Sequence, residues 1–253
     1  YAFDTVLNGF AASVKADDLD KLVEIEGVTL VEPDAIVTAY EDTSSSTEVD
    51  YESDLISPMM NTSNSFLGIE KLWENGIEGQ GIKVAVIDTG IDADHPEFQG
   101  IYKGGKNFVP HTGTDYARPR ADDDASETSP LDRPAHRPEF NANGSSFYTS
   151  HGTHVAGTIA AIGANQYGIK GIAPKVDLYA YRVLGAYGSG STSNIIKAID
   201  TAVIEEMDEI MKSKFVETFE KIRVEFKEVF KKLFKGGDGV LELTDPEDIL
   251  NTG

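Results

Sequence analysis

The sequence has no cysteine, few basic residues and no long apolar run. The lack of cysteine excludes a disulfide scaffold, a thiolate zinc site and a cysteine nucleophile. The 253 residues carry 22 Lys and Arg against 43 Asp and Glu, a formal net charge of −21. This balance argues against nucleic acid as a partner, because phosphates are bound by clustered cations. The longest apolar run, 155–164, contains glycines and is shorter than the about 18 residues that a membrane helix needs, so no membrane span is expected.

Three changes in the residue pattern divide the chain into four regions. Each region has its own hydrophobic periodicity or lacks one. We expect a small α+β unit, a linker, a main α/β domain and a helical tail, at 1–41, 42–64, 65–204 and 205–253 respectively.

The first region is too small to bury a core on its own. It predicts an extended stretch at 3–14, a helix between Asp17 and Gly27, and a strand at 28–31. The Ser-rich, aperiodic linker that follows is typical of segments that proteases cut.

The main domain alternates strand and helix patterns. Near-continuous apolar runs at 83–88 and 176–184 predict buried strands, and helical spacing is found at 151–161 and 193–203. This alternation favours a parallel α/β sheet.

Two irregular stretches interrupt the alternation. The Gly-rich stretch 185–190 predicts a flexible loop. The polar stretch 99–149 holds five of the ten prolines, and we expect it to be a surface excursion.

The tail predicts one long amphipathic helix. Apolar residues recur at three- and four-residue steps from Met207 to Leu233, and its aromatic residues predict a packing face. A Gly-Gly pair then stops the helix. A strand is expected at 240–244, and Asp245 is the expected cap of a further short helix.

Asp88 and His151 are the candidates for chemistry. Asp88 ends a predicted buried strand, and His151 opens a predicted helix of small residues. A carboxylate in this place can hold an imidazole in one tautomer while the imidazole accepts a proton from a nucleophile. The alternative is structural: an acid that caps a strand end and a histidine that ends a helix.

Two segments resemble the Asp and His motifs of subtilisin-like serine endopeptidases. They read Val-Ala-Val-Ile-Asp-Thr-Gly-Ile-Asp-Ala-Asp-His-Pro-Glu-Phe at 84–98 and Ser-His-Gly-Thr-His-Val-Ala-Gly-Thr at 150–158. They occur in the family's order, Asp before His. The resemblance implies a secreted hydrolase that cleaves peptide or protein substrates. It also implies that Asp88 is the orienting acid, His151 the general base and His154 a structural residue.

The stretches 168–174 and 178–185 continue the family pattern. The resemblance implies that an extended substrate pairs with the segment that follows, where glycines let another backbone approach. The expected substrate-binding residues are Leu184, Gly185, Gly188, Ser189 and Gly190.

No cofactor and no metal site are expected. Asn165 falls where some relatives place a calcium ligand, and with one matching position calcium is a minor alternative. His111 and His136 lie near aspartates, but their spacing does not resemble a ligand set. The chain starts at Tyr1 without a signal peptide, so the expected extracellular location comes from the resemblance alone.

Residues 8–14 and 27–34 resemble the second half of the inhibitory propeptide that precedes such enzymes. In that family the propeptide assists folding, and its tail occupies the substrate cleft. The resemblance therefore implies that residues 1–41 are a partner in cis, with the first part of the propeptide missing.

The nucleophile of the family is not recognisable. No Gly-Thr-Ser-Met-like motif occurs, and the stretch after His151 is shorter than the roughly 150 residues that separate histidine and serine in subtilisin. The expectation is a truncated chain without catalytic activity. Two alternatives remain: a pseudoprotease that binds peptides, and a fusion whose tail binds a partner.

The tail resembles a second family. Residues 214–248, with spaced phenylalanines, Leu-Phe-Lys-Gly-Gly and Leu-Thr-Asp-Pro-Glu-Asp, are similar to the stretch of structural-maintenance-of-chromosomes ATPases where the coiled coil re-enters the head. No Walker A, signature or Walker B sequence is present, so ATP binding is not implied. The resemblance implies a chimera with a junction near Glu205.

Overall fold

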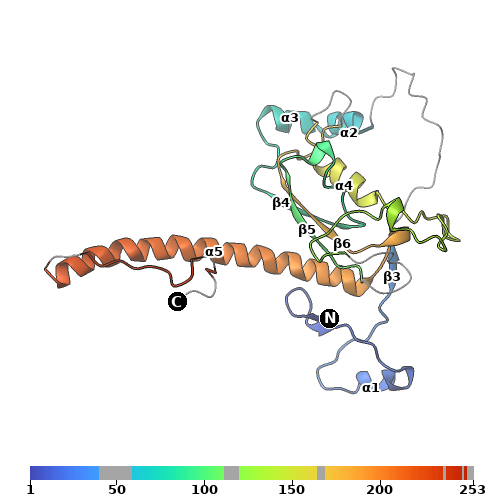
Figure 1. The fold of residues 1–253 in the computed structure, drawn as a ribbon, viewed down its shortest axis with the longest axis horizontal. Coiled ribbons are helices and arrows are strands. Elements are labelled where there is room, and N and C mark those ends of the chain that lie inside the picture. Colours follow the sequence, from blue (N-terminus) through green and yellow to red (C-terminus); the bar gives the residue numbers. More distant parts are fainter. Residues whose placement is uncertain (40–58, 111–119, 164–168, 236–237, 247, 250–253) are drawn as a thin grey trace. The chain divides into compact units, whose positions relative to one another are not determined.

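The computed structural model describes residues 1–39, 59–110, 120–163, 169–235, 238–246 and 248–249 (Figure 1). Two compact units make up the chain. The first consists of Tyr1–Phe3 and Gly9–Ile199, and the second of Asp4–Asn8 and Asp200–Gly253.

A parallel three-stranded sheet forms the centre of the first unit. Its strands are β4 (Lys83–Asp88), β5 (Tyr102–Asn107) and β6 (Asp177–Arg182), in the order β4-β6-β5. Helix α4 (His151–Ala160) packs against β4. The predicted parallel α/β fold is confirmed, because the apolar runs form the strands and the small-residue segment forms the covering helix.

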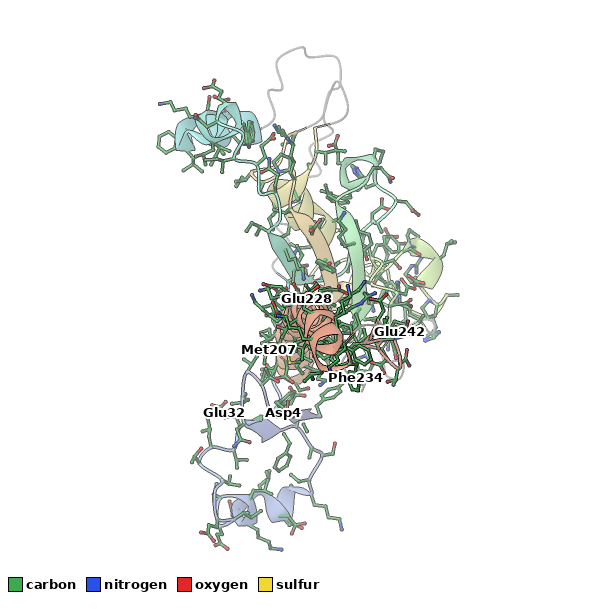
Figure 2. The ribbon with its side chains drawn as sticks, turned by 90° about the vertical axis from the view of Figure 1, so that its left-hand side faces the viewer. Asp4, Glu32, Met207, Glu228, Phe234 and Glu242 are labelled. Atoms are coloured by element: carbon green, nitrogen blue, oxygen red, sulfur yellow. The ribbon has the colours of Figure 1, made fainter. Side chains whose placement is uncertain are left out.

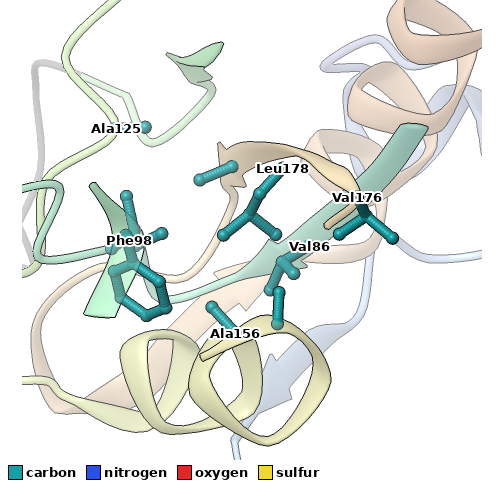
Figure 3. Packing of buried hydrophobic residues seen from close by; sticks show 9 residues of the cluster. Val86, Phe98, Ala125, Ala156, Val176 and Leu178 are labelled. Atoms are coloured by element: carbon teal, nitrogen blue, oxygen red, sulfur yellow. The ribbon is translucent and has the colours of Figure 1, made fainter. Parts of the chain in front are cut away.

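The core lies between this sheet and α4. Figure 3 shows Ala156 of α4 facing Val86 and Leu178 of the sheet, with Phe98 beside them. Leu178 and Ala156 have no exposed surface. Ala156 and Ala160 on the inner face of α4 are small, so the helix lies close to the strands and the core between helix and sheet is densely packed.

Strand β5 lies inside the stretch expected to be a surface excursion, and that prediction was wrong. The same stretch contains Phe147, which is 1% exposed, and Arg120, whose side chain is 1% exposed. The Arg120 guanidinium donates to the Asp132 carboxylate at 2.8 Å and to the carbonyls of Ser126 and Glu127. The hydrogen bonds of the buried Arg120 thus hold residues 120–132 together, although this polar segment has no hydrophobic periodicity.

Two short helices precede β4: α2 (Met59–Leu67), which begins inside the predicted linker, and α3 (Ile69–Glu74). The Trp73 indole of α3 donates to the Ile172 carbonyl at 3.0 Å. Close by, the hydrogen bond from Lys170 and a second from Lys175 hold the pKa of the Glu78 carboxyl below its usual value. These contacts tie α3 and the residues after it to the segment that leads into β6.

The N-terminal region forms a hairpin, β1 (Ala2–Phe3) with β2 (Gly9–Phe10), and a helical turn, Ala16–Asp18 followed by α1 (Leu19–Leu22). The strand expected at 28–31 does not form. A strand is found later instead, as β3 (Ile36–Thr38), where a partner backbone is available in β7 (Ser189–Ser191).

Helix α5 runs without a break over Thr192–Leu233. The sequence predicted two helices here, but the stretch 193–203 and the tail helix are continuous because no residue between them interrupts the helical backbone. Figure 2 draws the side chains along this helix and labels Met207 and Glu228 on it and Phe234 directly after it. In the second unit, the Asp200 carboxylate accepts the backbone N–H groups of Thr5 and Val6 at 3.1 and 3.0 Å.

The end of the tail differs from its prediction. Among the described residues after α5 there is no strand at 240–244 and no helix after Asp245. Asp245 still accepts the N–H of Asp248 at 3.2 Å, which is the bond expected of a cap. Gly239 lies against the rings of Phe226 and Phe230, so part of the aromatic stripe is a packing face as predicted. The predicted helix stop at 236–237 lies outside the described residues.

Candidate active site

Asp88 and His151 meet at the carboxyl end of the sheet. Asp88 is the last residue of β4 and His151 the first of α4. His151 Nδ1 lies 2.8 Å and 2.9 Å from the two carboxylate oxygens of Asp88. A carboxylate only accepts, so Nδ1 carries the proton in this pair and Nε2 is the atom that can accept another.

The backbone around Asp88 fixes both side chains. The Thr89 N–H donates to Asp88 Oδ1 at 2.6 Å, and the Thr89 hydroxyl accepts the Gly152 N–H at 2.9 Å. A Cβ on Gly152 would lie 2.2 Å from the Gly90 carbonyl oxygen. The absence of a side chain at 152 therefore lets α4 start directly against the end of β4.

The pair differs in exposure. The side chain of Asp88 is 13% exposed, and that of His151 is 32% exposed. A shielded acid and an accessible imidazole suit an orienting group and a proton acceptor that a substrate can reach.

A second carboxylate, that of Glu127, lies at the first turn of α4, and no sequence pattern predicted it. Glu127 Oε1 accepts the backbone N–H of Thr153 at 2.9 Å and its hydroxyl at 3.1 Å. Glu127 Oε2 accepts the hydroxyl of Thr149 at 2.6 Å. Glu127 lies in an aperiodic polar segment, 24 residues before His151, so spacing alone did not indicate that it approaches α4.

The predicted substrate segment begins beside Asp88. The N–H groups of Val183 and Leu184 both donate to the Asp88 carbonyl, at 2.9 and 3.2 Å. Gly185 then opens the turn Ala186–Gly188, and β7 follows. The prediction of a flexible loop was wrong: residues 184–188 are buried, because Ala186 and Tyr187 of the turn pack against Phe147 and the turn leads into a paired strand.

Strand β7 is paired antiparallel with β3, with Val37 opposite Gly190. The ladder continues on both sides, where Ala39 N–H donates to the Gly188 carbonyl at 2.8 Å and Thr192 N–H to the Ala35 carbonyl at 2.9 Å. A Cβ on Gly190 would lie 2.1 Å from the Val183 carbonyl oxygen. Glycine is therefore required where the strand passes the end of β6.

A carboxylate anchors the entry to β3. Asp34 accepts the Ser193 N–H at 2.9 Å through Oδ1 and the Ser193 hydroxyl at 2.7 Å through Oδ2. Ser193 lies in the first turn of α5, where an acid is stabilised by the unpaired N–H groups of the helix.

Comparisons with known proteins agree with this arrangement. Residues 79–213, more than half of the chain, match the model described as Subtilase family. The chain belongs to the subtilase family. Residues 1–40 match the model of Peptidase inhibitor I9, so this subtilase chain also carries an inhibitor region ahead of its peptidase region.

The subtilase relatives include three proteins of Bacillus subtilis. The chain is 37% identical to Minor extracellular protease Vpr over 206 residues, which are 81% of this chain and 22% of that protein. It is 42% identical to Subtilisin E over 139 residues (55% and 28%) and 39% identical to Major intracellular serine protease over 144 residues (56% and 37%). The chain spans less than half the length of each of these relatives. Their names cover both extracellular and intracellular proteins.

The other predicted residues of this subtilase have mixed outcomes. His154, expected to be structural, has an exposed side chain, because it points away from the sheet on which α4 packs. Asn165 and His111 lie outside the described residues. Where the structure describes the chain, no group of three or more His, Asp or Glu side chains could hold a metal ion. In the same residues, no helix combines the length and apolarity needed to cross a membrane.

Proposed function

We propose that Asp88 and His151 are the acid and the general base of a serine endopeptidase, a hydrolase of peptide bonds. The observation that carries the proposal is the paired contact of His151 Nδ1 with both Asp88 oxygens, at 2.8 and 2.9 Å. This contact leaves Nε2 to take a proton, which is the geometry that a hydroxyl nucleophile needs.

The reaction follows from this tautomer. A serine hydroxyl gives its proton to His151 Nε2 as its oxygen bonds to the peptide carbonyl carbon. The imidazolium, stabilised by Asp88, returns the proton to the leaving amine, and an acyl-enzyme remains. A water molecule then gives a proton to Nε2, its oxygen replaces the serine oxygen, and the serine regains its proton.

The substrate site is proposed along β7. Leu184, Gly185, Gly188, Ser189 and Gly190 would bind an extended peptide or protein segment as an added antiparallel strand. Strand β3 supports this proposal, because it already uses the β7 backbone in that way. Residues 1–41 would act as an inhibitor in cis by occupying the same backbone groups.

We further propose that these 253 residues have no peptidase activity by themselves. The serines after His151 are found at 189, 191, 193 and 213, and none has the sequence context of the family's nucleophile. In the proposed division, 1–41 is the propeptide, 42–64 the linker and 65–204 the peptidase region. An extracellular location is proposed from the resemblance to secreted relatives.

The test joins residues 1–204 to the serine-bearing remainder of a subtilisin. We expect the hybrid to react with a fluorophosphonate probe and to cleave a peptide substrate, and H151A or D88N to lower kcat/KM by about 10⁴-fold or more. H154A is the matched control, since this histidine of the same helix is exposed and should leave the rate nearly unchanged. Probe labelling of the original 253-residue chain, or an unchanged rate in H151A, would contradict the proposal.

We propose a second candidate function for residues 205–253, the region that we also propose to be related to the head fragment of structural-maintenance-of-chromosomes ATPases. We propose that this region binds a partner through α5. Apolar side chains on the helix support it: Met207, Ile210 and Met211 are each about half exposed, at 51, 52 and 49%. They lie at i, i+3 and i+4 and therefore share one face.

A further inference from the structure

Besides the Thr89 hydroxyl, the Glu127 side chain holds the first turn of α4 from outside the helix. Glu127 accepts a hydroxyl from Thr149, which precedes His151, and both a hydroxyl and a backbone N–H from Thr153, which follows it. The two threonines lie on either side of His151 in the chain. One carboxylate therefore bridges a residue before the proposed base and a residue after it.

Glu127 is itself fixed in place. The buried guanidinium of Arg120 donates to the Glu127 carbonyl at 2.9 Å. The Glu127 backbone also packs against Gly90, where an added Cβ would lie 2.9 Å from the Glu127 nitrogen. Gly90 is two residues past Asp88, so the segment with Glu127 is packed against the strand end that carries the orienting acid.

The bonds continue into the centre of the sheet. Thr149 accepts the Thr128 N–H at 2.9 Å through its hydroxyl and donates its own N–H to the Thr128 carbonyl at 3.0 Å. The Thr128 hydroxyl accepts from Arg182 at 2.9 Å. Arg182 is 1% exposed and stands opposite Asp88 in the pairing of β4 with β6. Thr149 thus connects Glu127 to the buried strand next to the pair.

From these contacts we propose that Glu127 is a positioning residue that holds His151 on Asp88 and favours the protonated imidazole. The proposal rests on the proposed role of His151. The carboxylate adds a negative charge at the helix turn that carries the base, beside that of Asp88. Of the buried cations nearby, Arg120 pairs with the Asp132 carboxylate, and Arg182 donates to Asn107 and to the Thr128 hydroxyl. The Glu127 carboxylate bonds to Thr149 and Thr153, on either side of His151, so we expect it to act through His151.

Three substitutions separate charge from structure. E127Q keeps an oxygen for the Thr153 N–H but removes the charge, and E127A removes both. E97Q is the control, because Glu97 is also a buried carboxylate that accepts a backbone N–H, from Gly163 at 2.6 Å, but beyond the other end of α4. The readout is NMR of the full 253-residue chain with labelled histidine, with the His151 signals assigned through H151Q.

We expect His151 in E127Q to bind a proton about threefold or more weakly than in the unsubstituted chain, while its Nδ1–H signal and the fold persist. E127A should also weaken the Nδ1–H signal, because the turn is no longer held. E97Q should leave both readouts unchanged. If E127A does not fold, E127Q still decides the matter.

D88N distinguishes failure of this inference from failure of the proposed function. If D88N alters the His151 titration and E127Q changes it no more than E97Q does, the positioning role of Glu127 is overturned and the pair stands. If D88N has no effect either, the pair itself is refuted, and with it the inference.

Discussion

Gly152 sets the distance between the helix and the strand that carry the two candidate residues. Its N–H donates to the Thr89 hydroxyl, and its Cα faces the Gly90 carbonyl without an intervening side chain. The neighbouring His151 reaches Asp88 because the helix starts this close to the strand end. Function here depends on a side chain that is absent.

Replacing Gly152 by alanine should therefore destabilise the chain. The added Cβ would lie 2.2 Å from the Gly90 oxygen, and backbone must move to admit it. We expect the free energy of unfolding to fall by about 2 kcal/mol, because the cost of overpacking exceeds the gain in helix propensity. Urea unfolding followed by circular dichroism would measure this.

Gly157 in the same helix is the control, since apart from its own helix backbone and its two chain neighbours nothing lies within 4 Å of its added Cβ. G157A should stabilise the chain by about 0.5–1 kcal/mol. Equal effects of the two substitutions would show that contact with Gly90 is not what determines the stability.

Sequence reasoning placed Asp88 and His151 correctly on a strand end and a helix start, since each lies in an uninterrupted periodic segment. It missed Glu127 for a physical reason. Glu127 lies close to Thr153 because the buried Arg120 holds the polar segment around it in place. Neither Glu127 nor Arg120 belongs to a hydrophobic repeat, so no periodic pattern predicted this contact.

At the scale of elements, β3 and β7 depend on each other. Strand β7 is three residues long and rich in glycine and serine, so little in its own sequence favours a strand. Its partner comes from about 150 residues earlier in the chain. The loop predicted at 185–190 was wrong because pairing with a distant segment overrides local glycine content.

Proline at Val37 should loosen this pairing. The ladder bonds at Ala39 and Thr192 place Val37 at a hydrogen-bonded position opposite Gly190, and proline removes its donor. We expect amide exchange in Ser189–Ser191 to accelerate by about 3- to 10-fold, the effect of one lost bond. Hydrogen exchange read by mass spectrometry checks this.

Thr38 offers the comparison, because its N–H points away from β7 in the same ladder. T38P should change exchange in β7 less than V37P does. The reverse order would mean that the register of the pairing is not the one described.

At the scale of the whole molecule, α5 passes through both compact units, and the change in residue pattern near Glu205 leaves no mark on its backbone. Helical spacing is found both before and after Glu205. Only the residue composition changes there, and that change was the reason for predicting a boundary. The division of the chain at 205 remains a prediction, as do the ends of the other predicted regions.

The exposed apolar face of α5 formed by Met207, Ile210 and Met211 predicts association between copies of the chain. We expect the chain to self-associate through this shared apolar face, and replacing Met207, Ile210 and Met211 together by glutamate should abolish that association. Sedimentation velocity across a range of concentrations would measure the change. V216E is the control, because Val216 is 40% exposed on the opposite side of the helix. Identical sedimentation of the parent chain and the triple variant would rule out this face.

The pairing of β3 with β7 has a consequence for competition. Strand β3 belongs to the inhibitor region and is covalently attached to the chain that carries β7, so its effective concentration at β7 does not fall when the protein is diluted. A free peptide displaces β3 from β7 only when its concentration, multiplied by its affinity relative to that of β3, exceeds the effective concentration of the attached strand. One cut in the intervening chain would turn this into an ordinary equilibrium between separate molecules, in which dilution alone frees the strand.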